Sequence, residues 1–122
     1  MKKNKIKVIC FDIDQVICKT NKNFYNKSKP NKNTIMYINA LYNSGYTIKI
    51  FTARYMGSHK EDVNLIKKKF YKKTLYQLKK WGLKFHKLYM GKPSFDIFVD
   101  DKSLDFKKSW QKQLSKLVNV KK

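Results

Sequence analysis

Two aspartates at the end of an apolar run are the residues of this chain best suited to chemistry. Asp12 and Asp14 follow the run Ile9-Cys10-Phe11 and are spaced i, i+2. On an extended strand, this spacing places both side chains on the same face. Two carboxylates at the end of a buried strand need a partner, such as a metal ion or a phosphoryl group with its cations. The alternative is a strand that simply ends in an Asx turn, so the choice depends on the rest of the chain.

The acidic residues of the chain are few and fall into groups. Among 122 residues there are 29 Lys and Arg but only 8 Asp and Glu, which gives a net charge of +21. Asp12 and Asp14 form one group, and residues 96–105 hold a second group of four aspartates. The remaining pair, Glu61 and Asp62, precedes a predicted helix. A chain with so few carboxylates has placed most of them in two short segments, which favours a site over a chance turn.

The apolar pattern predicts alternating strands and helices. Four apolar, β-branched or aromatic runs are predicted as strands, at residues 6–11, 46–52, 85–90 and 96–99. Helices are predicted at 34–44, within 59–81 as one helix or two, at 104–108 and after 110. The first of these is expected to be capped by Asn33 and the second by a Ser58–Glu61 capping box. Cys10 is expected to pack in the core, and 15–33 is expected to be a loop.

This order of elements favours an α/β fold, a Rossmann-like parallel sheet flanked by helices in a single domain. Ligands of such sheets bind beyond the carboxyl ends of the strands. Thr52 ends the second predicted strand, Lys92 follows the third, and Asp100 and Asp101 end the fourth. A hydroxyl, a lysine and several carboxylates are the groups that hold and transfer a phosphoryl group, and oxygen ligands of this kind suit Mg²⁺.

Four segments of the chain resemble the motifs of the haloacid dehalogenase (HAD) superfamily of phosphohydrolases, in the same order. They are Phe11-Asp12-Ile13-Asp14, Phe51-Thr52-Ala53-Arg54, Lys92 and Phe98-Val99-Asp100-Asp101. The resemblance covers about residues 6–108 and implies a HAD-like core, with a basic helix and tail at 109–122. A softer likeness, around 81–86, 91–96 and 100–102, is to short members associated with capsular polysaccharide biosynthesis.

The resemblance implies a catalytic role for each matching residue. Asp12 is the nucleophile and forms an aspartyl-phosphate, and Asp14 protonates the leaving oxygen and then activates water. Thr52, Ala53 and Lys92 bind the phosphoryl group.

The resemblance also implies a Mg²⁺ site. Asp12, the backbone carbonyl of Asp14 and the Asp100 carboxylate are its expected ligands, and Asp101 belongs to the shell around the metal. Arg54 is the only arginine of the chain. It is either a fork for a substrate anion or a turn residue paired with a helix end.

One residue departs from the family pattern, and one part of the family architecture is missing. The family usually has glycine where this chain has Gln15, so the loop geometry, and with it the activity, is open to question. The spans between the motifs leave no room for a large cap domain, and only residues 15–33 and 53–60 can cover the site. Capless members are covered by a partner in an oligomer or act on large substrates, so a homo-oligomer is one of two open alternatives.

The strongly positive charge favours anionic ligands. All but one of the basic residues are lysines spread along the chain, which is typical of A+T-rich coding and argues against a nucleic-acid partner without excluding one.

The predicted function is a Mg²⁺-dependent phosphatase of a small phosphorylated metabolite, such as a sugar phosphate. The alternatives are a phosphatase of nucleic-acid ends and a binding module with weakened activity. With no signal peptide and no apolar run of about 18 residues, we expect a cytoplasmic protein without a membrane partner.

Overall fold

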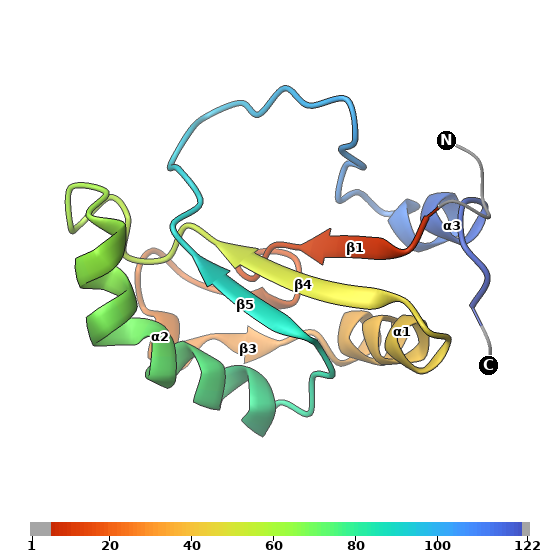
Figure 1. Ribbon diagram of the computed structural model, residues 1–122, viewed down its shortest axis with the longest axis horizontal. Coiled ribbons are helices and arrows are strands. Elements are labelled where there is room, and N and C mark those ends of the chain that lie inside the picture. Colours follow the sequence, from red (N-terminus) through yellow and green to blue (C-terminus); the bar gives the residue numbers. More distant parts are fainter. Residues whose placement is uncertain (1–5, 121–122) are drawn as a thin grey trace.

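The computed structural model describes residues 6–120, and its centre is a parallel sheet of three strands (Figure 1). The strands are β1 (Val8–Phe11), β4 (Thr47–Thr52) and β5 (Lys87–Met90), in the order β1-β4-β5. Helix α1 (Lys32–Asn43) connects β1 to β4, and α2 (Val63–Lys80) connects β4 to β5. The predicted α/β class is therefore confirmed, in a sheet smaller than expected.

The central strand β4 contributes one face of the sheet to the hydrophobic core. Its side chains alternate between buried and half-buried, and Ile48, Ile50 and Thr52 have no exposed surface. Residues two positions apart on a strand share a face, so these three side chains face the same layer. Ile38 and Leu41 of α1 are equally buried and belong to the same apolar cluster. One part of the core thus lies between β4 and α1, and Ile66 and Leu78 of α2 belong to the same buried cluster.

The predicted loop 15–33 contains three short elements. They are β2 (Cys18–Lys19), the 3-10 helix η2 (Tyr25–Lys27) and β3 (Lys29–Pro30). β2 and β3 pair antiparallel, and Asn31 N donates to Ile17 O at 2.8 Å just beyond this pairing. Ile13 and Ile17 are completely buried, so the segment after β1 is anchored to the core at both ends of its first turn.

Both long helices begin at side-chain caps other than those predicted. Asn31, not Asn33, caps α1 by accepting a hydrogen bond from Thr34 N at 3.1 Å. Asp62 caps α2 by accepting from Leu65 N, also at 3.1 Å. The predicted Ser58–Glu61 capping box is therefore wrong, and α2 is a single helix.

The predicted fourth strand at 96–99 and the helix at 104–108 do not form. Residues 91–109 are a loop that arches away from the sheet between β5 and α3 (Trp110–Ser115) (Figure 1). Ile97 and Val99 are 82% and 91% exposed. As a result β1 lies at the edge of the sheet, and Cys10 is exposed rather than buried as predicted.

The predicted helix after residue 110 is present as the short α3. The Trp110 ring lies 6.1 Å from the Phe11 ring and 5.3 Å from the Tyr37 ring, between centroids. Tyr37 Oη also donates to Gln111 O at 3.2 Å. α3 thus fastens the chain end to β1 and α1. Within residues 6–120, no helix has both the length and the apolar character needed to cross a membrane.

Candidate functional site

The carboxyl ends of the three parallel strands bring Asp12, Thr52 and Lys92 together. Asp12 follows β1, Thr52 is the last residue of β4, and Lys92 follows β5 after one glycine. Lys92 Nζ lies 3.1 Å from Asp12 Oδ2, although the residues are 80 positions apart. The Lys92 backbone N–H donates to Thr52 O at 3.0 Å. The topology thus assembles three of the predicted residues at one edge, where parallel α/β sheets bind ligands.

The Asp12 side chain is held but remains accessible. Its Oδ1 accepts from Ile13 N at 2.8 Å, and the side chain is 34% exposed. The Lys92 side chain is 18% exposed, and its ammonium lies 5.3 Å and 5.8 Å from the ring centroids of Phe95 and Phe98. A carboxylate beside a fixed cation can approach an anionic phosphoryl group, because the cation offsets the repulsion.

The second aspartate of the motif is paired with the only arginine. Arg54 Nε lies 2.9 Å from Asp14 Oδ2, and Arg54 Nη2 lies 2.9 Å from Asp14 Oδ1. The Arg54 side chain is 1% exposed, whereas that of Asp14 is 22% exposed. A fork that engages both carboxylate oxygens is the strong geometry for such a pair. Arg54, expected to meet either a substrate anion or a helix end, has Asp14 as its partner in this structure.

Further polar side chains of the 15–33 segment complete the surroundings of Asp14. The Thr20 hydroxyl donates to Asp14 Oδ1, and it also shares a hydrogen bond with the Ser28 hydroxyl. Burial raises the pKa of the Cys18 thiol, which therefore stays protonated near neutral pH and donates to Asp14 Oδ1 at 3.7 Å. None of these three side chains was predicted, because small side chains in a segment of short elements carry no periodicity that points to a site.

Gln15 adopts the backbone conformation that a glycine would favour. Its φ is 66°, in the left-handed region. Its backbone N–H donates to Cys18 O at 2.8 Å, and its side-chain Nε2 donates to Thr20 O at 2.6 Å. The departure from the family pattern therefore leaves a tight turn in place after Asp14.

The remaining predicted residues do not join Asp12. Asp100 and Asp101 are exposed on the 91–109 loop. Lys102 N donates to Asp100 Oδ1 at 3.0 Å, and this backbone hydrogen bond lowers the pKa of the Asp100 carboxyl. Within residues 6–120, no group of three or more His, Cys, Asp or Glu side chains could hold a metal. The carboxylates in this arrangement do not fit the magnesium site that the resemblance implies.

The phosphate-binding candidates of the second motif differ in accessibility. Thr52 is completely buried, and its Oγ1 accepts from Arg54 N at 3.1 Å. Ala53 is half-buried, and its carbonyl accepts from Met56 N at 3.1 Å. Thr52 therefore fixes the turn that carries Arg54.

Comparison with known proteins adds evidence on the fold. No family model matches the chain, and no curated protein matches it. A crystal structure of a structural genomics target from Vibrio cholerae superposes with a TM-score of 0.76. The two sequences are 21% identical, and the match covers 91% of this chain and 98% of the other. At this identity the likeness shows the fold alone.

Proposed function

We propose that this chain is a phosphomonoester hydrolase of the haloacid dehalogenase type, acting on a small phosphorylated metabolite through Asp12. The observation that carries the proposal is the ion pair of Asp12 and Lys92, 3.1 Å long, at the carboxyl edge of the sheet. It offers a partly exposed oxygen nucleophile next to a cation that can bind phosphoryl oxygens. The order of the four motifs supports the same reaction class.

The reaction has two displacements at phosphorus. An Asp12 carboxylate oxygen attacks the phosphorus, so that a new P–O bond forms while the ester P–O bond breaks. The leaving oxygen takes a proton from Asp14. Water then attacks the phosphorus of the aspartyl-phosphate, gives a proton to Asp14 and releases inorganic phosphate, which restores the Asp12 carboxylate. Lys92 offsets the negative charge of the phosphoryl oxygens in both steps.

The contacts of Asp14 favour one other function, a binding module with weakened catalysis. Arg54 engages both oxygens of Asp14, and Thr20 and Cys18 donate further hydrogen bonds to Oδ1. Proton transfer by Asp14 requires it to give up at least one of these contacts. A chain that kept Asp14 in the pair would still bind a phosphoryl group at Asp12 and Lys92 without turning it over.

The assay that separates these functions is hydrolysis of an aryl phosphate, with and without added Mg²⁺ and with EDTA. We expect turnover by the wild type, and Asp12→Asn should lower it by at least about a thousandfold, the scale seen when a nucleophile is removed. Asp105→Asn, an exposed change in the 91–109 loop, is the matched control and should retain activity. No turnover by the wild type would refute the enzyme and leave the binding module, whereas full activity of Asp12→Asn would refute Asp12 as the nucleophile.

The net charge of +21 keeps phosphatase action on nucleic-acid ends as an alternative. Binding to nucleic acid through many lysines weakens steeply between about 50 and 200 mM salt. Dephosphorylation of a 5′-phosphorylated oligonucleotide that is efficient at low salt and collapses over this range would favour the alternative. Activity on small phosphates with a shallow salt dependence is what we expect.

A further inference from the structure

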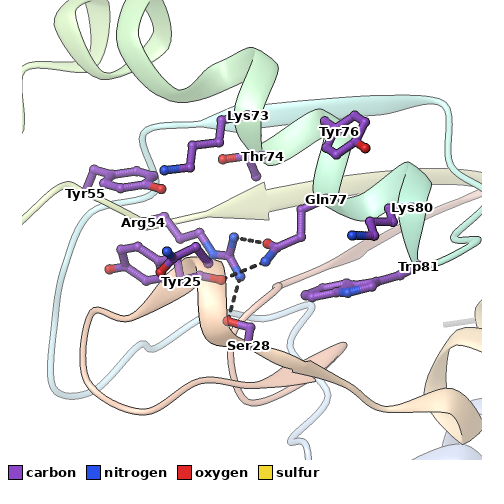
Figure 2. Close-up of a pocket in the computed structure, with 11 residues that line it drawn as sticks. Tyr25, Ser28, Arg54, Tyr55, Lys73, Thr74, Tyr76, Gln77, Lys80 and Trp81 are labelled. Carbon is purple, nitrogen blue, oxygen red and sulfur yellow. Dashed lines mark hydrogen bonds between the residues drawn. The ribbon is translucent and has the colours of Figure 1, made fainter.

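A hollow separate from the Asp12–Lys92 pair lies between α2 and the segment of residues 25–28 (Figure 2). Its volume is about 350 Å³, within the range of ~300–1,000 Å³ that small-molecule sites occupy. Arg54 forms part of its wall, so the hollow adjoins the buried Arg54–Asp14 pair. Asp12 and Lys92 are not among the residues that line it.

One face of α2 supplies the cationic part of the wall. Lys73, Gln77 and Lys80 line the hollow, and spacings of three and four residues place side chains on the same face of a helix. Figure 2 shows both lysine side chains extending along the hollow, on either side of Gln77. None of the lining residues is acidic, and within residues 6–120 the ion pairs are Arg54–Asp14 and Lys92–Asp12. Lys73 and Lys80 can therefore meet an incoming anion.

A buried hydroxyl in the same wall lacks a partner. Thr74 is 1% exposed, and its Oγ1 has no hydrogen-bond partner in the described part of the chain. Leaving such a group unpaired is unfavourable, and a polar ligand atom would satisfy it once the side chain turns the hydroxyl, which has less than 1 Å² of exposed surface, toward the hollow. Arg54 does not serve in this way, because Asp14 and Gln77 already accept from its nitrogens. Thr74 is thus the buried polar group best placed to receive a ligand.

Aromatic side chains, among them Tyr25, Tyr55 and Trp81, form another part of the wall. The Arg54 guanidinium lies over the Tyr25 ring at 4.9 Å, and the Tyr55 ring stacks on Phe70 at 3.7 Å between centroids. One face of each tyrosine ring is therefore covered. Trp81 is half-buried, and no ring contact involves it within residues 6–120. Its indole lies along the hollow at the end away from Tyr55 (Figure 2), so it can stack with a planar group.

We propose that this hollow binds a small anion that carries a planar ring, the chemistry of a nucleoside monophosphate. The anionic group meets Lys73 and Lys80, a polar atom of the ligand pairs with the Thr74 hydroxyl, and the ring stacks on Trp81. This binding needs no turnover, so it stands or falls independently of the proposed phosphatase activity.

The test is binding of AMP in a buffer that contains EDTA, followed by calorimetry and by tryptophan fluorescence. The chain has two tryptophans, and the Trp110→Phe variant leaves Trp81 as the only reporter. We expect AMP to bind and to change the Trp81 emission. Adenosine lacks the charge and ribose 5-phosphate lacks the ring, so each should bind at least about tenfold more weakly. Equal binding of ribose 5-phosphate and AMP would overturn the stacking role of Trp81.

Matched variants of α2 separate this site from the general positive field. Lys73→Gln/Lys80→Gln should weaken AMP binding by at least about tenfold, whereas Lys72→Gln/Lys79→Gln, with the same net charge, should change it less than about twofold. Thr74→Val keeps the shape and should also weaken binding. Circular dichroism confirms that each variant is folded. Equal losses in the two lysine pairs, or no AMP binding by the wild type, would refute the site.

Discussion

At Gln15, a φ of 66° carries a conformational cost of about 1 to 2 kcal/mol for a residue with a Cβ. The hydrogen bond from Gln15 Nε2 to Thr20 O offsets it by about 1 kcal/mol. Gln15→Gly removes both, and it adds freedom to the unfolded chain. We therefore expect the free energy of unfolding, measured with urea, to change by less than about 1 kcal/mol. Gln15→Val, β-branched and without the hydrogen bond, should lose at least about 2 kcal/mol. If Gln15→Val is as stable as the wild type, the turn does not hold residue 15 at positive φ.

The pairing of Arg54 with Asp14 predicts a large effect on stability. Arg54→Met leaves the Asp14 carboxylate without its fork, and we expect a loss of about 2 to 3 kcal/mol in urea denaturation, reduced from the value for a fully buried pair because Asp14 is 22% exposed. The double variant Arg54→Met/Asp14→Asn should lose less than the sum of the single variants, with a coupling of about 1 to 2 kcal/mol. Additive losses would contradict a direct pair and favour Arg54 as a substrate residue.

Residue types alone left the partner of Arg54 open. A single arginine in a lysine-rich chain indicates a need for a planar fork, but both a substrate anion and a protein carboxylate meet that need. Which of the two partners Arg54 meets depends on how the 15–33 segment folds back over the sheet. The burial of Ile13 and Ile17 in the core fixes that position. Their apolar pattern spans one turn and is too short to predict such a position from sequence. The positions of Thr20 and Ser28 beside Asp14 depend on the same fold of the 15–33 segment, so they were not predictable from the sequence either.

At the scale of elements, the three strands of the parallel sheet were predicted from the sequence. The fourth predicted strand, at 96–99, does not form. β4 shows the alternation of a half-buried strand, and its burial follows that pattern. The 96–99 run has similar apolar residues, but the residues around it make contacts away from the edge of the sheet. Ser94 N donates to Glu61 Oε1 at 3.2 Å, and the Phe95 and Phe98 rings lie near the Lys92 ammonium. The local sequence pattern indicates the tendency of a segment to form a strand. It does not indicate whether the segment pairs with the edge of a sheet.

Gly91 fixes how β5 presents Lys92 to Asp12. Its φ is 97°, and a Cβ at this position would lie 2.8 Å from Val63 Cγ1 at the start of α2. We expect Gly91→Ala to lose about 2 to 4 kcal/mol, from the strained backbone and the overpacking together. Thermal denaturation measures the loss, and the same variant should reduce any activity that depends on Lys92.

Two other glycines separate the two causes of this loss. Gly82 has a φ of 78° with open space around its position, so Gly82→Ala should lose only the backbone part, about 1 kcal/mol. Gly57 has open space and no positive φ, so Gly57→Ala should change stability by less than about 1 kcal/mol. A loss in Gly91→Ala no larger than that in Gly82→Ala would show that Val63 moves aside freely.

For the whole molecule, the order of elements predicted the class of fold but not its extent. Alternating strands and helices indicated a parallel sheet, and the likeness to the Vibrio cholerae structure spans 91% of the chain. The motif order also placed Asp12, Thr52 and Lys92 at one edge. It did not place Asp100 there, because a position in the sequence order carries no information on how a 19-residue span, 91–109, folds. The candidate site was thus predictable wherever a strand of the sheet carries the residue.

The charge of the whole molecule predicts how its stability depends on salt. With a net charge of +21, the compact state concentrates like charges and is destabilised by their repulsion. The attractive ion pairs in residues 6–120 number two, and the Arg54–Asp14 pair is too buried to be screened strongly. Raising NaCl from about 0.02 to 0.5 M shortens the screening length from tens of ångströms to a few. We therefore expect the midpoint of thermal unfolding to rise steadily over this range. A midpoint that falls would show that the attractive contacts outweigh the repulsion among the lysines.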